Sequence, residues 1–142
     1  MSMLVPKKAK FRKWQTGRRN PKRIGISSRG TKLSFGSYGI MATSAGRVKS
    51  NQLEAARKAI SRSIKKTGKL WIRVFPDRPY TAKPAEVKLG KGKGDVQGYV
   101  VDVWPGRVII EVDGLSKTES ESVLRKAGSK LPVKVKIVTR DI

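Results

Sequence analysis

The sequence contains no cysteine and no histidine. A chain without cysteine forms no disulfide and no zinc ribbon. Without either residue, the chain also lacks the usual catalytic nucleophile, general base and transition-metal ligands. We therefore expect a binding protein that is not an enzyme and that uses no metal or other cofactor.

Long apolar runs are missing as well. The longest runs hold about five residues, whereas a helix that spans a bilayer needs roughly 20. Residues 1–30 have no apolar stretch of the kind that a secretory signal needs, so we expect no export, although the segment is basic and acid-free like a transit peptide. The length of 142 residues suits one domain with a modest core.

Acidic residues are scarce and unevenly placed. The chain has 33 Lys and Arg residues against 10 Asp and Glu residues, a formal net charge of +23. Residues 1–53 carry 13 basic residues and no acid, since the first acid is Glu54; residues 54–94 carry 12 basic and three acidic residues, and residues 95–142 carry eight and seven. Such a charge repels itself unless a polyanion lies nearby. The first two thirds are therefore predicted to face that polyanion.

Residues 1–30 are predicted to form an extended basic arm, disordered when free and ordered against its partner. Phe11 and Trp14 lie among its cations, where an aromatic ring either stacks on unpaired RNA bases, worth roughly 1–3 kcal/mol per base, or docks the arm onto its own domain. The sequence leaves both interpretations open. The candidate RNA-binding cations of the arm are Lys7, Lys8, Lys10, Arg12, Lys13, Arg18, Arg19, Lys22 and Arg23.

Residues 31–142 are predicted to form one α+β domain, a two-layer arrangement with two helices packed on a mostly antiparallel sheet. Thr31 to Val48 looks like a simple β-ribbon, in which Gly36 and Gly39 indicate a bulge or a close approach of the backbone. Other strands are predicted at Lys69–Phe75, Tyr80–Leu89, Gln97–Trp104, Arg107–Asp113 and Val133–Val138.

Proline and glycine set the expected limits of these strands. Pro76 and Pro79 are predicted to end the strand that begins at Lys69. Pro105–Gly106 joins two apolar runs and predicts a hairpin between them.

The clearest helix is predicted over residues 50–67, with Asn51 and Glu54 at capping-box spacing, Ser50 as an alternative cap, and Gly68 as the stop. One face carries an apolar stripe for the core, and the opposite face is basic. That basic face either contacts RNA or is merely solvated. The apolar stripe is Leu53, Ala56, Ile60 and Ile64, and the basic face is Lys58, Arg62, Lys65 and Lys66.

A second helix is predicted from the capping-box pair Ser116 and Glu119 to about Gly128. Val123, Leu124 and Ala127 are expected to face inward.

A glycine-lysine loop is predicted at residues 88–94. Its glycines let the backbone approach a phosphate closely, and its lysines supply charge. The spacing matches neither the P-loop pattern nor GxGxxG, so the motif does not indicate a nucleotide site. A flexible hairpin tip is the alternative interpretation. The loop residues that we single out are Lys88, Gly90, Lys91, Gly92, Lys93 and Gly94.

Several blocks of the sequence together resemble one family, the bacterial-type large-subunit ribosomal protein L-sixteen. The blocks are LVPKKAKFRKWQTGR, RGTKLSFGSYGIMA, QLEAARKAISR, GKLWIRVFPDRP, VKLGKGKG, PGRVIIEVDG and KLPVKVKIVTR, in an order that runs from Met3 to about Asp141. The resemblance implies a hammerhead-like α+β fold and a late-assembling, non-catalytic protein. It further implies a place below the central protuberance, beside the channel that aminoacyl-tRNA enters.

The same resemblance suggests how the basic segments divide their work. Lys7 to Lys13 and the loop at 88–94 would lie closest to tRNA, whereas the basic helix face and Arg73 would lie closer to ribosomal RNA. Lys88-Leu89 stands where the family usually has Arg-Met, so this chain lacks a planar guanidinium at that position. The implied partners are large-subunit ribosomal RNA, tRNA and neighbouring ribosomal proteins, in a cytoplasmic or organellar ribosome, without a membrane and without homo-oligomers.

Three other functions are weighed against this one. A free-standing RNA-binding module would carry the same charge without a fixed ribosomal place. A nuclease with carboxylate-bound metal would need its acids to converge, yet Asp102, Glu111 and Asp113 lie on or beside strands with no evident basic or nucleophilic companion. A binder of acidic membranes would need a broad apolar helix face with aromatic anchors, which neither predicted helix has.

Overall fold

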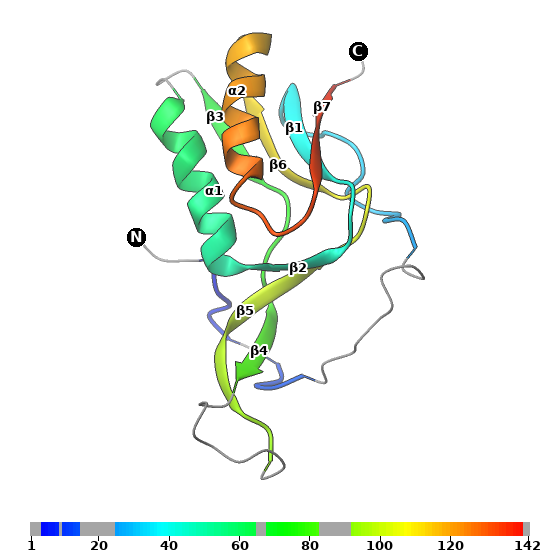
Figure 1. Cartoon of the computed structure of the whole chain (residues 1–142), viewed down its shortest axis with the longest axis vertical. Helices are drawn as coiled ribbons and strands as arrows, with labels where there is room; N and C mark the ends of the chain where they lie inside the picture. The colour runs from blue at the N-terminus through cyan, green and yellow to red at the C-terminus, as the bar shows by residue number, and fades with distance from the viewer. Residues whose placement is uncertain (1–3, 9, 15–24, 65–67, 83–91, 141–142) are drawn as a thin grey trace.

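A computed structural model describes residues 4–8, 10–14, 25–64, 68–82 and 92–140. Within these residues, two helices pack against antiparallel sheets, which confirms the predicted α+β class (Figure 1). The elements in chain order are β1 (Tyr38–Ala42), β2 (Gly46–Lys49), α1 (Ser50–Ser63), β3 (Lys69–Ile72), β4 (Arg78–Ala82), β5 (Asp95–Val103), β6 (Val108–Asp113), α2 (Lys117–Gly128) and β7 (Val135–Thr139).

The strands of the described residues form two sheets. One sheet has the order β3-β6-β1-β7 and the other has the order β2-β5-β4. The predicted β-ribbon within Thr31–Val48 is wrong, because β1 pairs with β6 and β7 whereas β2 pairs with β5. The predicted hairpin at Pro105–Gly106 is wrong for the same reason, since β5 and β6 lie in different sheets.

The core lies between the two helices and the four-stranded sheet (Figure 1). Leu53, Ala56 and Ile60 of α1 are fully buried and Ile64 packs partly buried against them, which confirms the apolar stripe. Each fully buried Leu or Ile side chain contributes roughly 1.5–3 kcal/mol. This burial fixes α1 with its opposite face turned to solvent.

The second helix begins and ends as predicted. The Ser116 hydroxyl accepts a hydrogen bond from the Glu119 N–H at 3.2 Å, and α2 ends at Gly128. Val123, Leu124 and Ala127 are buried in the core.

The start of α1 differs from its prediction. The helix begins at Ser50, and Lys49 is the N-cap residue. The Gln52 side-chain oxygen accepts the Lys49 N–H at 2.8 Å, so neither Ser50 nor Asn51 forms the expected cap with Glu54. Glu54 is instead buried and accepts a hydrogen bond from the guanidinium of Arg57 at 2.5 Å.

At its other end α1 stops after Ser63, with the Ile64 N–H donating to the Ile60 carbonyl at 3.0 Å. The helix was expected to reach Thr67, and residues 65–67 lie outside the described residues.

The region between β3 and β4 corrects two strand limits. β3 ends at Ile72, three residues before the predicted end at Phe75. Pro79, predicted to help end that strand, lies inside β4 opposite Tyr99. Pro79 is tolerated there because β4 is an edge strand, where a missing N–H need not break a ladder. The predicted strand to Leu89 continues into residues 83–91, which are outside the described part of the chain.

Residues 31–37 lie on the face of the four-stranded sheet that is opposite the helices, and two glycines make room for them. A Cβ on Gly39 would lie 2.6 Å from a methyl of Leu33, and a Cβ on Gly36 would lie 2.5 Å from the Val112 carbonyl oxygen. The predicted close approach is therefore confirmed. A register shift between Ile40 and Met41 adds an irregularity to the β1–β6 ladder.

Residues 27–30 are attached to the turn between β5 and β6. The Ser27 N–H donates to the Pro105 carbonyl at 2.8 Å, and the Val108 N–H donates to the Gly30 carbonyl at 2.7 Å. The Arg107 guanidinium donates to the Arg29 carbonyl at 3.3 Å. These bonds join the end of the predicted arm to the folded domain.

Candidate nucleic-acid interface

The described part of the arm carries exposed cations close to the domain. Leu4 packs against the core, which fixes the beginning of this segment. Lys13 is half-buried, and the other described cations are exposed: Lys7, Lys8, Lys10, Arg12 and Arg29. The remaining predicted cations, Arg18, Arg19, Lys22 and Arg23, lie outside the described residues.

The two aromatic residues of the arm are placed differently. The Arg78 guanidinium carbon lies 5.4 Å from the centre of the Trp14 ring, and the Lys93 ammonium donates to the Trp14 carbonyl oxygen at 2.5 Å. Phe11 is 58% exposed, and the Lys10 ammonium lies 5.5 Å from the centre of its ring. Trp14 therefore contacts β4, whereas more than half of the Phe11 side chain is exposed; base stacking stays a prediction for both rings.

A basic cluster on the three-stranded sheet was missed by sequence reasoning. Asp102 of β5 accepts from Arg47 of β2 at 2.9 Å and from Arg78 of β4 at 3.2 Å, so this acid does have basic companions. Beside it, the Lys49 ammonium lies 5.1 Å from the centre of the Tyr80 ring. Arg47 and Lys49 lie two residues apart in β2 and therefore on the same face of the strand. This spacing is the signal that could have predicted a shared basic face.

The outward face of α1 presents the cations predicted for it, as far as the described residues extend. Lys58 and Arg62 are exposed and lie one turn apart. Arg57 is instead paired with Glu54, and this hydrogen bond lowers the pKa of Glu54 although burial opposes the shift. Lys65 and Lys66 lie outside the described residues.

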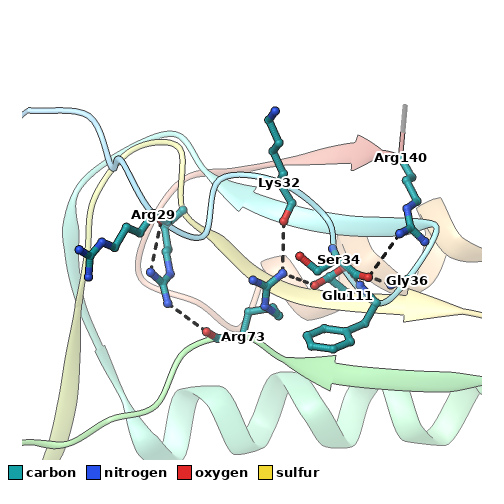
Figure 2. Close-up of polar contacts among 9 residues, drawn as sticks. Arg29, Lys32, Ser34, Gly36, Arg73, Glu111 and Arg140 are labelled. Carbon is teal, nitrogen blue, oxygen red and sulfur yellow. Dashed lines mark hydrogen bonds and ion pairs between the residues drawn. The ribbon is translucent and has the colours of Figure 1, made fainter. Parts of the chain in front are cut away.

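Arg73 is bound to a buried carboxylate (Figure 2). Its guanidinium donates to Glu111 at 2.5 Å and to the Lys32 carbonyl at 3.2 Å. The Arg73 side chain is 18% exposed and the Glu111 side chain is 0% exposed. The Arg73 guanidinium, which is predicted to contact ribosomal RNA, is therefore already bound to an internal carboxylate.

Glu111 also fastens residues 34–36 onto β6. Its other oxygen accepts the N–H groups of Ser34, Phe35 and Gly36 at 2.9, 3.0 and 3.1 Å (Figure 2). Burial by itself raises the pKa of Glu111, but the hydrogen bonds from Gly36, Arg73, Phe35 and Ser34 outweigh it and lower the pKa overall. The carboxylate is thus charged and serves as an internal anchor.

Only the last part of the glycine-lysine loop is described. Lys93 is exposed except for its bond to Trp14, and Gly92 has a φ of +102°, a conformation that favours glycine. Gly94 immediately precedes β5. The other residues singled out in this loop, Lys88, Gly90 and Lys91, lie outside the described residues.

Comparison with known proteins identifies the family. The family model for ribosomal protein L16p/L10e matches residues 6–138. The chain belongs to this family. It is 49% identical over 140 residues to the large ribosomal subunit protein uL16 of Alkalilimnicola ehrlichii, with 99% of each chain covered. The proteins of the same description from Halorhodospira halophila and Francisella philomiragia are 48% and 47% identical over the same length and coverage.

Membership of the L16p/L10e family confirms the resemblance seen in the sequence and the expectation of a ribosomal protein that is not an enzyme. The acids that a nuclease would need are engaged separately: Asp102 and Glu111 bind arginines, and Asp113 accepts the Ser37 hydroxyl at 2.9 Å. Among the described residues, no group of three acids gathers as a metal site. No helix in the described ranges is long and apolar enough to cross a membrane.

Proposed function

We propose that this protein is a constituent of the large ribosomal subunit and binds large-subunit ribosomal RNA. Family membership supports the ribosomal assignment, and the relatives named above are described as large-subunit proteins. The observation that carries RNA binding is the acid-free run of 53 residues with 13 cations, of which those on the described arm are mostly exposed. A partner with regularly spaced negative charges matches that distribution.

The proposed mechanism is electrostatic docking followed by recognition of RNA shape. Each phosphate that a Lys or Arg neutralises releases condensed counterion, which adds roughly −0.7 to −0.9 to the slope of log K against log salt concentration. Such contacts position the protein and carry little sequence information. Specificity comes from folded RNA shape, unpaired bases and 2′-hydroxyl groups.

Within this proposal the basic segments have different neighbours. The arm, Arg73 and the α1 face with Lys58 and Arg62 contact ribosomal RNA. The loop at 88–94 and the arm at 7–13 lie nearest tRNA, so the protein joins the subunit late and helps organise the aminoacyl-tRNA and peptidyl-tRNA sites. The Lys93–Trp14 bond supports a common location for the loop and the arm.

The first test of this proposal is sedimentation of the tagged chain from cell lysate, before and after a high-salt wash. We expect the protein to remain with the large subunit after the wash, because many simultaneous contacts hold it there. Release into lighter RNA fractions would instead favour a free RNA-binding module and overturn the ribosomal assignment.

The division of labour has its own test. Changing Lys91 and Lys93 together to Ala is expected to impair tRNA binding by assembled ribosomes more than incorporation of the protein into subunits. The matched control changes Lys134 and Lys136 to Ala, two exposed lysines at β7 in the charge-balanced third of the chain. Complete loss of incorporation in the loop variant would contradict the assignment of this loop to tRNA.

A further inference from the structure

An aromatic pair, of which Phe35 is exposed and Trp71 is half-buried, lies on the face of the four-stranded sheet that is opposite the helices. The rings of Phe35 and Trp71 are stacked, with their centres 5.9 Å apart and an angle of 21° between their planes. Phe35 is 54% exposed, which is high for a large apolar side chain with a stacking partner. The Arg73 guanidinium carbon lies 5.3 Å from the centre of the Phe35 ring.

The buried Glu111 carboxylate binds two members of this cluster. One carboxylate oxygen accepts the backbone N–H of Phe35 at 3.0 Å, and the other accepts the guanidinium of Arg73 at 2.5 Å. The third member, Trp71, lies directly opposite Glu111 in the β3–β6 ladder. Both rings and the guanidinium are therefore fixed to one sheet, so little conformational entropy remains to be lost when a ligand binds.

The exposed charge around the cluster is positive. Lys32, three residues before Phe35, and Lys69, two residues before Trp71, are both exposed. Of the two acids beside the cluster, Glu111 is fully buried. Asp113, the cross-strand partner of Lys69, is partly exposed, and one of its oxygens accepts from Ser37 and from the Gly114 N–H at 2.9 Å each. A ligand at this place would meet a flat apolar ring beside cations.

We infer that Phe35, Trp71 and Arg73 form a stacking site for an unpaired RNA base, with Lys32 and Lys69 beside it for the flanking phosphates. Bases stack on aromatic rings and on guanidinium planes, and each base carries a phosphate that the lysines complement. The two lysines favour RNA over a protein partner, because protein interfaces are depleted in lysine although they are enriched in aromatic residues and arginine. This inference rests on the proposed RNA binding and adds to it a particular site.

The site is tested with the full-length chain and two RNA probes of equal length. One is single-stranded oligoadenylate, and the other is the same ribose-phosphate chain without bases. Phe35→Leu keeps an apolar side chain but removes the ring, and Phe35→Tyr keeps the ring. Phe75→Leu is the matched control, because Phe75 is 47% exposed and lies outside the stacked pair. Equal thermal unfolding midpoints show that the variants are comparably folded.

We expect Phe35→Leu to bind oligoadenylate about tenfold more weakly, with little change for the abasic probe and an unchanged salt slope. Phe35→Tyr and Phe75→Leu should bind like the unaltered chain. Ultraviolet cross-linking of the unaltered chain should attach a base to a peptide that contains residue 35 or 71, a result that needs no variant.

Equal loss in Phe35→Leu and Phe75→Leu, or no loss in either, overturns the site. Phe35→Leu that binds RNA normally yet fails to enter subunits also overturns it, and indicates a protein partner at this face. If the unaltered chain binds neither probe, the proposed RNA binding itself fails, which is a different result from failure of the site alone.

Discussion

Glu111 illustrates how one buried acid can organise a strongly basic protein. Its carboxylate is fully buried, yet four hydrogen bonds reach it, three from consecutive backbone N–H groups and one from Arg73. These bonds offset the cost of taking a charge out of water. They also connect β6, the segment at 34–36 and the end of β3 at one point.

Replacing Glu111 with Gln should be strongly destabilising. The amide oxygen can still accept N–H groups, but no negative charge remains to balance Arg73. We expect the free energy of unfolding to fall by roughly 3 kcal/mol, as when one partner of a buried ion pair is removed. Urea denaturation measures this change. Asp77→Asn removes an exposed carboxylate and should change the same quantity by less than about 0.5 kcal/mol. Equal effects of the two changes would show that Glu111 is no anchor.

Stability should depend on pH in a direction set by Glu111 and Glu54, since the pKa of each is lowered in the folded protein. Acids of this kind contribute stability that is fully present above about pH 4.5 and is lost as the pH falls through the lower folded-state pKa. The thermal midpoint should therefore be flat near neutral pH and should decline in acid. Glu111→Gln should show a shallower decline, and an identical acid profile would contradict the assignment.

At the scale of elements, the turn between β5 and β6 depends on a glycine. Gly106 has a φ of +95°, and its N–H donates to the Ala42 carbonyl at 2.8 Å. Gly106→Ala should lower the free energy of unfolding by about 1–2 kcal/mol, because a Cβ strains this backbone conformation. Gly25→Ala is the control: its Cβ would meet nothing within 4 Å, and its φ is not positive. Circular dichroism in urea compares the two variants.

The exposed face of α1 gives a second prediction at this scale. Changing Lys58 and Arg62 to Ala should reduce the magnitude of the salt slope for RNA binding by about 1.5, as expected for two lost phosphate contacts. The thermal midpoint should hardly change, because both side chains are exposed. Arg125 and Lys126 of α2 are an equally exposed pair, and changing them to Ala should leave the slope unaltered. Equal slopes for both double variants would remove α1 from the proposed interface.

Sequence reasoning succeeded where the signal is local. The Ser116 cap of α2 and the apolar stripe of α1 depend on residues within one or two turns, and the structure confirms both. It failed for the hairpins, because strand alternation and a Pro-Gly turn do not determine which distant strand completes a sheet. The candidate interface also contains local and non-local features. The helix period predicted Lys58 and Arg62 on an outward face. The contacts of Asp102 with Arg47 and Arg78 could not be predicted, because they depend on the pairing of β5 with β2 and β4.

At the scale of the whole molecule, the basic arm is attached to the domain at separate points. Leu4 packs on the core, Trp14 contacts Arg78 and Lys93, and residues 27–30 bond to the β5–β6 turn. The side chains at Leu4 and Trp14 are half-buried or exposed, whereas residues 27–30 are attached through backbone hydrogen bonds.

Two truncations should separate these attachments. A chain without residues 1–24 keeps the bonds of Ser27, Arg29 and Gly30, and should remain folded with a small loss of stability. Removing residues 1–30 should also leave a folded domain, but with a clearly lower thermal midpoint by circular dichroism, since Val108 and Arg107 lose hydrogen-bond partners. Equal midpoints would show that residues 27–30 contribute nothing, and an unfolded 31–142 chain would place them within the core domain.

The order of the strands in the two sheets also determines how late in translation the sheets can form. Every strand pair of the described structure includes β5, β6 or β7, so each needs a strand that begins at residue 95 or later. A nascent chain of 94 residues holds 25 basic and three acidic residues but can complete none of these ladders. Contacts between distant parts of a sequence form slowly. Translation of the charge-balanced third therefore determines when the polycationic two thirds can fold.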